Sequence, residues 1–510
     1  MKITGQQYFA GQWQAQNPPS WSSFDPAANQ PLPFQFSETT DAEIDSACEA
    51  AWQAFKIYRK SPADKRATFL SAIADEILAL GDQLLETAMQ ESGLPRMRIE
   101  GERGRTMNQL RLFANNLENP YRTVLIDQAQ PDRQPLPKSD HRMGTVALGP
   151  VAVFGASNFP LAFSVAGGDT ASAFAAGCPV VVKSHPAHPA TSELVAIAID
   201  AAAKKTAMPK GVFALLQGQR NELSSTLVQH PRIQAVGFTG SNRVGLLLAK
   251  LAANRPQPIP FYGELGANNP QIILAETLAS KTDALVEMQV SSMMMGHGQF
   301  CTCPGMILVV RGSGLDEYRQ ALKNQIEAQA SGSMLTPGIA QSYTDQVDRY
   351  REHLSLVAEG KADGHHTAAA IFEVKAAALT DELLDECFGP FSLLIVCEDQ
   401  AELLKTIEKL HGQLSASIHG SEAELASNSA IIDALEMKVG RLIFNQMPTG
   451  VEVCNSMFHG GPYPASTTAH FTSIGGEAIL RFTRPICYQN MPDSIRPVEL
   501  KEGAANQIAG

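Results

Sequence analysis

The chain has 510 residues, with 40 Lys and Arg against 52 Asp and Glu, which gives a formal net charge of −12 at pH 7. This acidic balance argues against a nucleic-acid-binding surface built on bulk positive charge. Hydrophobic residues make up 44% and charged residues 18%, the composition of a globular protein with a large core. At about 150 residues per domain, the length predicts two or three domains.

Eight cysteines with no Cys-x-x-Cys pair argue against a disulfide scaffold and against paired zinc-finger spacing. The first residues, MKITGQQYFAGQW, lack the apolar segment of a secretory signal, and no apolar run approaches the length of a membrane span. We therefore expect a cytoplasmic protein with reduced thiols, no membrane segment and no nucleic-acid partner.

The first part of the chain is expected to be helical after a short extended lead. Apolar residues between 41 and 60 recur at helical spacing. The next helix has a start signal, with Ser61 as its cap and Pro62 at the first helical position. A third helix is expected over about 97–117. The proline-containing segment 128–142 is expected to form an extended arm.

From residue 151 onward, short apolar runs alternate with helical segments. The expected strands are 151–154, 180–182, 212–216, 235–238 and 260–262, followed by 271–274, 306–310, 392–396 and 479–482. The small-residue segment after the first run is expected to be helical through Ala176. The Ala-rich piece 367–378 is expected to be plain helix or strand at the surface. This alternation predicts an α/β fold with two parallel-sheet lobes, which bind ligands outside the carboxyl ends of their strands.

The strongest local signal is the run Gly296-His-Gly-Gln-Phe-Cys301-Thr-Cys-Pro-Gly305. Such a setting allows close backbone approach, and N–H groups beside a nucleophilic thiolate can stabilise an oxyanion. Most cytosolic cysteines are instead small buried hydrophobes, and Cys303 competes for the role. A metal site at Cys301 and Cys303 lacks partner ligands at a suitable spacing, so no metal is expected.

Three further runs follow predicted strands. Glu264 follows the strand 260–262, where it can act as a general base or be a solvated loop carboxylate. Asn158 can donate its side-chain amide to an oxyanion or merely shape its loop. The run Gly237-Phe-Thr-Gly-Ser-Asn-Arg-Val-Gly245 opens a helix whose N-terminus can hold phosphate, although the fingerprint GxGxxG is absent.

In order and spacing, these runs resemble the aldehyde dehydrogenase superfamily from near the N-terminus to about residue 490. The matching pieces are Asn158-Phe-Pro160, Lys183, Phe238-Thr-Gly-Ser241, Glu264-Leu-Gly266, Gly298-Gln-Phe-Cys301 and Glu386-Cys-Phe-Gly-Pro390. The resemblance implies two Rossmann-like lobes with a small β oligomerisation arm. It places an NAD(P)-binding domain at 1–127 and 146–262, a catalytic domain at 263–470, and the arm and tail at 128–145 and 471–510.

The resemblance also implies a mechanism and selects Cys301 rather than Cys303 as the nucleophile. Cys301 would add to the aldehyde carbon, and the oxyanion would accept from Asn158 and from the Cys301 N–H. Hydride would leave to a nicotinamide, and Glu264 would activate water to hydrolyse the thioester. The cofactor-binding candidates are Lys183, Ser184, Arg220, Gly240, Ser241, Gly245, Leu265, Glu386 and Phe388, although Lys183 can equally be a surface lysine and Phe388 a core residue.

The segment after the second strand predicts which dinucleotide is used. Many NAD-preferring relatives carry Lys-Pro-Ser-Glu there, but this chain reads Lys183-Ser-His-Pro186 and lacks the carboxylate. Without that negative charge a 2′-phosphate is repelled less, and Arg220 can pair with it. We therefore expect NADP to be preferred, or NADP and NAD both to be used.

The runs Gly155–Asp169, Pro448–Glu452 and His459-Gly-Gly-Pro-Tyr-Pro464 are similar to one branch of the superfamily, whose members oxidise α-ketoglutaric semialdehyde or long-chain fatty aldehydes. We expect the first substrate, which would be converted to 2-oxoglutarate. Its carboxylate calls for a cation, for which Arg105 and Arg111 are candidates, although either can serve interdomain salt bridges instead. The rings of Phe159, Phe163 and Phe458 are expected to wall the pocket, unless they are ordinary core residues.

The resemblance implies a homodimer or homotetramer that associates through the arm. Two other enzyme readings remain open at this point: a fatty or broad-specificity aldehyde dehydrogenase, and a variant that passes the acyl group to coenzyme A. A non-catalytic structural or binding protein on the same fold is a third reading, since a fold does not fix a function. The presence of Cys301, Glu264 and Asn158 argues against a non-catalytic protein. Glu264 favours hydrolysis by water over transfer of the acyl group to coenzyme A.

Overall fold

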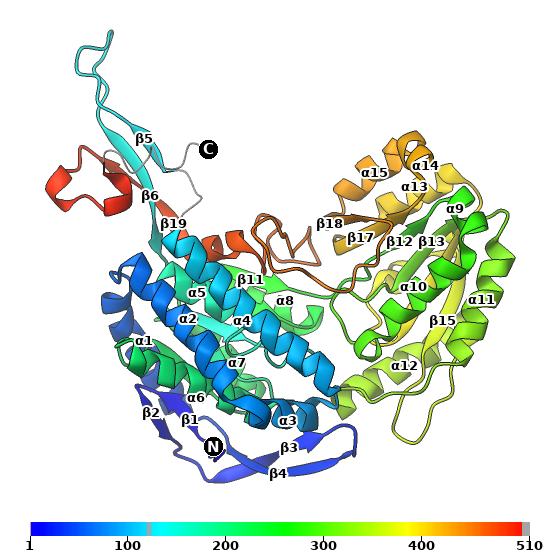
Figure 1. Cartoon of the computed structure of the whole chain (residues 1–510), viewed down its shortest axis with the longest axis horizontal. Coiled ribbons are helices and arrows are strands. Elements are labelled where there is room, and N and C mark those ends of the chain that lie inside the picture. Colours follow the sequence, from blue (N-terminus) through cyan, green and yellow to red (C-terminus); the bar gives the residue numbers. More distant parts are fainter. Residues whose placement is uncertain (1, 120–123, 502–510) are drawn as a thin grey trace.

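The computed structural model describes residues 2–119 and 124–501 of the chain. Two large α/β lobes lie side by side, and a thin β arm projects from the first lobe (Figure 1). No helix within these described ranges combines the length and the apolar composition that a membrane span requires.

The first lobe is built on a seven-stranded sheet with the order β11-β10-β7-β8-β9-β1-β2, in which β7 to β11 are parallel and β1 and β2 are antiparallel. Its strands are β1 (Gln7–Phe9), β2 (Gln12–Gln14), β7 (Val151–Phe154), β8 (Val180–Lys183), β9 (Phe213–Leu216), β10 (Ala235–Thr239) and β11 (Phe261–Glu264). Its helices are α1 (Asp41–Tyr58), α2 (Ala63–Ala79), α3 (Gly81–Ser92), α4 (Arg96–Glu118), α5 (Gly168–Ala176), α6 (Pro189–Lys205), α7 (Asn221–Gln229) and α8 (Asn242–Ala253).

Alternate residues of these strands face two different cores. Val151 and Val153 pack with α2 to α6, whereas Ala152 and Phe154 pack with α1, α7 and α8. Side chains of a strand alternate between its two faces, so a strand covered by helices on both sides must be apolar throughout. This requirement explains the continuous apolar runs in the sequence.

The second lobe repeats this plan with a sheet of order β14-β15-β16-β13-β12-β17-β18, antiparallel only at β14. Its strands are β12 (Gln271–Ile273), β13 (Met306–Val310), β14 (Ser355–Glu359), β15 (Ala370–Lys375), β16 (Phe391–Cys397), β17 (Gln413–His419) and β18 (Val439–Phe444). Its helices are α9 (Ala275–Ser280), α10 (Thr282–Met294), α11 (Leu315–Glu327), α12 (Pro337–His353), α13 (Gln400–Lys409), α14 (Glu422–Ser427) and α15 (Ser429–Glu436).

Two smaller sheets complete the described chain. The hairpin of β3 (Pro19–Asp25) and β4 (Gln30–Ser37) runs along the outside of the first lobe (Figure 1). The arm is a three-stranded antiparallel sheet of order β19-β6-β5, built from β5 (Leu125–Asp127), β6 (His141–Ala147) and β19 (Thr483–Gln489). The expected extended excursion over 128–142 is therefore largely the connection between two strands of this arm.

The structure corrects two of the predicted element boundaries in the first lobe. Helix α2 begins at Ala63, and its N-cap is Pro62; Ser61 makes no side-chain cap, while its N–H donates to the carbonyl of Tyr58 and its carbonyl accepts from Arg66. The segment 155–167 is not helical, and α5 begins only at Gly168.

Two predicted elements in the second half are also wrong in kind or position. Residues 479–482 belong to a 3-10 helix, η4 (Gly476–Phe482), of which Ala478 and Phe482 pack into the core of the first lobe; strand β19 begins at Thr483. The Ala-rich piece 367–378 contains β15, which lies buried inside the second sheet rather than at the surface.

Candidate active site

The residues predicted to act in catalysis meet where the two lobes face each other. Asn158 follows β7, and Glu264 is the last residue of β11 rather than a residue after it, so both stand at the carboxyl edge of the first sheet. Cys301 lies between a 3-10 turn, η1 (Met295–Gly298), and β13 of the second lobe. His459 belongs to the long segment between β18 and η4, which crosses between the lobes (Figure 1).

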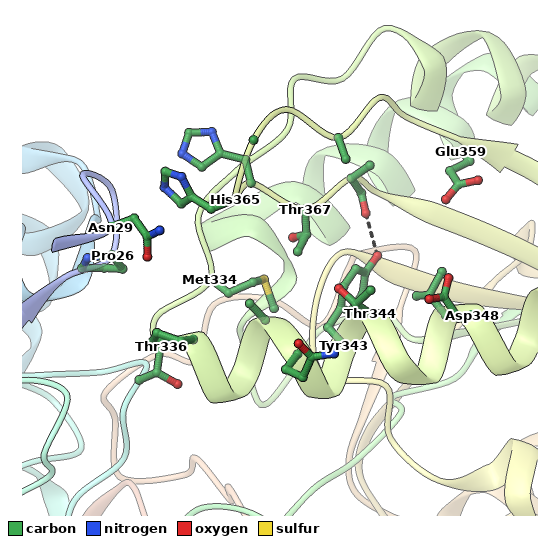
Figure 2. A pocket seen from close by; sticks show the side chains of 18 of the residues that line it. Pro26, Asn29, Met334, Thr336, Tyr343, Thr344, Asp348, Glu359, His365 and Thr367 are labelled. Atoms are coloured by element: carbon green, nitrogen blue, oxygen red, sulfur yellow. Dashed lines mark hydrogen bonds between the residues drawn. The ribbon is translucent and has the colours of Figure 1, made fainter.

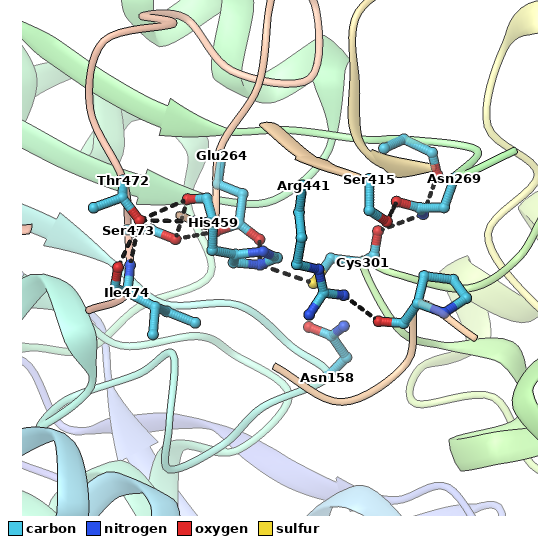
Figure 3. Close-up of polar contacts among 12 residues, drawn as sticks. Asn158, Glu264, Asn269, Cys301, Ser415, Arg441, His459, Thr472, Ser473 and Ile474 are labelled. Atoms are coloured by element: carbon cyan, nitrogen blue, oxygen red, sulfur yellow. Dashed lines mark hydrogen bonds and ion pairs between the residues drawn. The ribbon is translucent and has the colours of Figure 1, made fainter. Parts of the chain in front are cut away.

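Three side chains form a continuous polar series at the centre of this site (Figure 3). Nε2 of His459 lies 2.8 Å from Oε1 of Glu264 and 3.5 Å from Sγ of Cys301. The hydroxyl of Ser473 donates to the other oxygen of Glu264 at 2.5 Å. Glu264 and His459 are buried, and Cys301 is half-buried. A thiol, an imidazole and a carboxylate in series are the groups that activate a nucleophile.

His459 is held in place by its own backbone. Its N–H donates to Oγ1 of Thr472 at 2.7 Å, and its carbonyl accepts from the N–H of Ser473 at 2.8 Å. In the sequence, His459 opens the run His459–Pro464 and has no predicted catalytic role. The only signal was that motif, because 158 residues separate His459 from Cys301.

The protonation of this series follows from burial and charge. Burial raises the pKa of the Cys301 thiol well above its usual value, and the Glu264 carboxylate raises it further. Burial also raises the pKa of Glu264, but the charge of His459 and hydrogen bonds from His459, Ser473 and Cys301 outweigh it, so this pKa lies below its usual value. The resting site therefore holds an ionised carboxylate and a protonated thiol, which must lose its proton before it attacks.

The same three residues are also possible metal ligands. One ligand atom from each of Glu264, Cys301 and His459 lies within 4.8 Å of the others. Thiolate, imidazole and carboxylate are the ligands that zinc prefers. The expectation that the protein uses no metal therefore stays a prediction.

Asn158 is placed to donate to an oxyanion on Cys301. Its Nδ2 donates one proton to the carbonyl of Gln299 at 2.9 Å, and Figure 3 shows its side chain beside Cys301. Because an amide nitrogen carries two protons, the second can serve a ligand. Cys303 is buried with its Sγ 3.8 Å from the carbonyl of Gly389, and burial raises its pKa.

Two of the predicted motifs meet through their backbones. Gly298 has a φ of +71°, and a Cβ at this position would overlap the backbone of Gly389 and Pro390. Only glycine allows this approach without strain. The contact fixes the loop that carries Cys301 against the segment that follows Glu386 and Phe388.

Aromatic rings and a guanidinium lie beside the catalytic series. The ring centroids of Phe159 and Phe163 are 5.2 Å apart, and that of Phe163 is 6.0 Å from the imidazole of His459. Cζ of Arg105 sits 5.7 Å and 5.2 Å from the two phenyl centroids. Nη2 of Arg105 is buried and has no hydrogen-bond partner among the described residues. The structure thus brings three predicted substrate residues together.

Arg441 of β18 is a second cation at this site, which the sequence analysis did not name. Figure 3 shows its guanidinium beside Cys301 and Asn158. It donates to the carbonyls of Gly450, at 3.0 Å, and Pro448, while its buried Nε has no partner within the described ranges. No sequence signal marked Arg441, because its place depends on the pairing of β17 with β18.

The other two predicted substrate residues have different surroundings. Arg111 does not join the site: it pairs with Asp75 of α2 at 3.1 Å, and both side chains are about half exposed. Arg111 lies six residues after Arg105 on α4, which turns it toward a different face of the helix. Phe458 is half-buried next to Gly440, where a Cβ would meet its ring at 3.0 Å.

The predicted cofactor residues gather at the carboxyl edge of the first sheet. Burial lowers the pKa of Lys183, at the end of β8, to about 8, while the Glu38 carboxylate opposes this shift. Ser184 is buried, and its hydroxyl has no hydrogen-bond partner in the described chain. Ser241 caps α8 by accepting from Val244, and a Cβ on Gly245 would overlap Leu265.

The remaining cofactor candidates lie around the same predicted dinucleotide site. Glu386 reaches across to Gly266, where a Cβ would overlap its carboxylate, and burial raises its pKa to about 7. Phe388 is half-buried, and Gly240 donates its N–H to the carbonyl of Glu264. An unpaired buried hydroxyl, a capped helix N-terminus and glycines that keep the backbone open fit a nicotinamide dinucleotide.

Arg220 lies at the same edge, but its guanidinium already interacts with other residues of the chain. Its Nη2 donates to the carbonyl of Thr39 at 2.7 Å, and carboxylate oxygens of Glu38 and Asp41 lie 3.8 Å from its guanidinium. Arg220 is therefore near the predicted dinucleotide site, within reach of two negative charges, one just before α1 and one on its first residue.

A cavity of about 440 Å³ lies away from the catalytic series. It opens between the tip of the β3–β4 hairpin, near Asn29, and helix α12 with the loop that carries His365 (Figure 2). Nε2 of His365 contacts the carbonyl of Ala27 at 3.1 Å across this space. None of the predicted site residues lines this cavity.

Comparisons with known proteins give a consistent result. The model of the aldehyde dehydrogenase family matches residues 13–483. The chain is 46% identical to alpha-ketoglutaric semialdehyde dehydrogenase 2 of Azospirillum brasilense, over 98% of this chain and 97% of that protein. It is 43% identical to alpha-ketoglutaric semialdehyde dehydrogenase of Acinetobacter baylyi, over 98% and 96%.

Solved structures of the same fold are more distant in sequence. A betaine aldehyde dehydrogenase of Staphylococcus aureus superposes with a TM-score of 0.83 at 20% identity, over 98% of both chains. An aldehyde dehydrogenase of Pseudomonas syringae, solved as a cysteine-to-alanine mutant with NAD+ and octanal, superposes with a TM-score of 0.82 at 21% identity, over 96% of this chain and 97% of that one. These likenesses confirm the predicted fold.

Proposed function

The chain belongs to the aldehyde dehydrogenase family, and on this premise we propose that it oxidises an aldehyde to a carboxylate through a thioester on Cys301. The observation that carries the proposal is the polar series in which His459 lies 3.5 Å from the thiol and 2.8 Å from Glu264. This series offers the thiol proton a path to a buried base.

In the proposed mechanism, Sγ of Cys301 attacks the aldehyde carbon while its proton passes to the ionised carboxylate of Glu264, which the Nε2–H of His459 holds beside the sulfur. The oxyanion accepts from Nδ2 of Asn158 and from the Cys301 N–H. A nicotinamide dinucleotide, when bound, supplies the hydride acceptor that turns this adduct into a thioester. Glu264 releases that proton to solvent and then takes a proton from water, which attacks the thioester carbon; the leaving thiolate takes this proton back, and the carboxylic acid is released.

We propose α-ketoglutaric semialdehyde as the substrate and 2-oxoglutarate as the product. The names of two relatives at 46% and 43% identity support this assignment, and so does the charge of the pocket. Arg105 and Arg441 each keep a buried N–H without an acceptor among the described residues. A buried donor without a partner costs free energy, and a substrate that carries a carboxylate next to a ketone would satisfy both.

The test of the substrate assignment is a panel of aldehydes with wild type and Cys301→Ala, followed by formation of the reduced cofactor. Cys301→Ala should oxidise none of them. Arg105→Met should lower kcat/KM for α-ketoglutaric semialdehyde about 100-fold, because a charge-assisted hydrogen bond is lost, and should leave pentanal nearly unchanged. Arg103→Met, on the same helix, is the matched control. Equal losses with both aldehydes would reject the role of Arg105.

A second candidate function is the oxidation of fatty or diverse aldehydes. Three aromatic rings favour this function, because together they form an apolar wall. The ring centroid of Phe159 lies 5.2 Å from that of Phe163 and 5.1 Å from that of Phe300. If kcat/KM rises with chain length and does not respond to a terminal carboxylate, this second function replaces the first.

We further propose that NADP is preferred over NAD. The absence of a carboxylate in Lys183–Pro186 and the position of Arg220 support this preference. A kcat/KM larger with NADP than with NAD is expected, and a large advantage for NAD would contradict it.

The organisation of the protein completes the proposal. We assign residues 1–127 and 146–262 to dinucleotide binding and 263–470 to catalysis, and we assign the arm and tail, 128–145 and 471–510, to assembly into a homodimer or homotetramer. The three-stranded arm sheet, which projects from the first lobe, supports the last assignment. A cytoplasmic location follows from the expectation of reduced thiols.

A further inference from the structure

Glu38, between β4 and α1, is held at the carboxyl edge of the first sheet by its neighbours. The N–H of Ser37 donates to the carbonyl of Gly5 at 2.9 Å. The N–H and hydroxyl of Thr39 both donate to the carbonyl of Gln217, at 3.0 Å and 2.6 Å. The backbone on both sides of Glu38 is thus fixed, and this places the Glu38 side chain at the edge of the sheet.

The two oxygens of the Glu38 carboxylate have different surroundings. Oε1 accepts from the N–H of Gln219 at 2.8 Å. Oε2 is buried and has no hydrogen-bond donor within the described residues. A Cβ on Gly218 would meet Oε2 at 2.5 Å, so only glycine at this position lets the oxygen lie where it does. A buried carboxylate oxygen without a donor is costly unless a ligand supplies one.

Two cations that the sequence assigns to the dinucleotide share this carboxylate. The Glu38 carboxylate opposes the lowering of the Lys183 pKa, and its Oε2 lies 3.8 Å from Nε of Arg220. The acceptor is therefore a neighbour of the arginine expected at a 2′-phosphate, and its charge reaches the lysine expected at the adenosine ribose. A carboxylate in this place accepts from a ribose hydroxyl and repels a phosphate dianion.

We propose that Glu38 sets the choice between the two dinucleotides, binding the ribose 2′-hydroxyl of NAD and opposing the 2′-phosphate of NADP. This inference rests on the proposed dinucleotide site. The carboxylate missing after Lys183 in the sequence is supplied by a residue 145 positions earlier in the chain. Arg220 favours the phosphate and Glu38 opposes it, so Glu38 limits the preference for NADP and keeps NAD in use.

The experiment measures binding rather than turnover. NADH and NADPH are titrated into the Cys301→Ala protein, and nucleotide fluorescence gives a Kd for each. Adding Glu38→Gln, whose amide oxygen can still accept from Gln219, should shift the ratio of the two Kd values toward NADPH about tenfold. Gly218→Ala, which displaces the carboxylate without removing its charge, should shift the ratio in the same direction and serves if Glu38→Gln does not fold.

Glu222→Gln is the matched control, because Glu222 is exposed on the first turn of α7, two residues after Arg220, and the change in net charge is the same. An unchanged ratio in both Glu38→Gln and Gly218→Ala, with both nucleotides still bound, overturns the role of Glu38. An equal shift in Glu222→Gln also overturns it, because the effect is then one of net charge. If neither nucleotide binds the Cys301→Ala protein, the proposed dinucleotide site itself is wrong.

Discussion

A single imidazole connects the nucleophile to the base in this protein. His459 contacts both Cys301 and Glu264 through the same nitrogen, so its N–H keeps the carboxylate beside the sulfur. The charge of Glu264 holds the proton on the thiol at rest, and the same carboxylate accepts that proton when the sulfur attacks. Glu264 therefore has opposite effects on the resting thiol and on the attacking thiolate.

The raised pKa of Cys301 gives a pH prediction. In the protein without cofactor, alkylation of Cys301 by iodoacetamide should become faster as the pH rises, without a plateau below about pH 9, because the fraction of reactive thiolate keeps growing until the pH passes the raised pKa. Glu264→Gln removes a charge that raises this pKa, so the whole profile should move to lower pH. Peptide mass spectrometry at Cys301 measures the rate, with Cys487, which is exposed, as the internal control.

The two profiles decide whether Glu264 acts on the sulfur. If alkylation of Cys301 follows the same pH dependence in wild type and in Glu264→Gln, the carboxylate does not act on the thiol. A profile that moves to higher pH in the variant contradicts the sign of the effect.

Site residues were predicted from the sequence where they belong to a short motif. They were missed where only the folded chain brings them close to the site. Cys301, Glu264 and Asn158 each sit in a recognisable run, and the structure places all three together. His459, Arg441 and Glu38 reach the two binding regions by contacts across more than a hundred residues. Arg111 and Arg105 share one helix in the sequence, and only the structure tells which face of α4 meets the site.

At the scale of elements, helix α4 holds the loop that carries Asn158. Oε1 of Glu102 accepts from the N–H groups of Leu161 and Ala162 at 2.8 Å and 2.9 Å, and Oε2 pairs with Arg98 at 2.6 Å. Glu102 is buried, so its hydrogen bonds and its ion pair are shielded from water. One carboxylate of α4 thus fixes the turn after β7 from which the oxyanion donor projects.

Glu102→Ala is therefore expected to destabilise the fold and to loosen the oxyanion loop. Removing one partner of a buried ion pair costs about 3–5 kcal/mol. The free energy of unfolding should fall by this order in urea titration, and kcat should fall more than KM rises. Glu100→Ala is the control, since Glu100 forms an exposed pair with Arg96 on the same helix. Similar losses in both variants would contradict the role of Glu102.

The elements themselves were predictable to different degrees. Strands such as Val151–Phe154 were found because burial on both faces demands unbroken apolar runs. The run 479–482 looked like a strand for the same reason, but two of the residues in η4 pack four positions apart against the first lobe. Composition alone does not tell these cases apart, because both bury apolar side chains and only tertiary packing sets the backbone.

At the scale of the whole molecule, the arm presents an exposed apolar row. Leu125 and Met143 lie opposite each other on β5 and β6, and Cys487 of β19 is opposite Met143 on its other side. All three side chains are exposed. A monomer rarely leaves an apolar row on a projecting sheet in water, and the row supports the proposal that a second copy of the chain covers it.

Met143→Glu tests that proposal. A charge in the middle of the row should weaken association, so light scattering after gel filtration should give the mass of a smaller species, with a greater effect at low protein concentration. Met97→Glu, at another exposed methionine on α4, should leave the mass unchanged. A wild-type protein that already runs at the mass of one chain would contradict the oligomeric assignment.

The division of the site between the two lobes has one further consequence. Glu264 belongs to the first sheet and Cys301 to a loop of the second, so neither lobe by itself contains a complete catalyst. If the chain were produced as two fragments cut in the connection between β11 and β12, each would be inert alone. Any turnover would then report reassembly of the halves and would decline as the mixture is diluted.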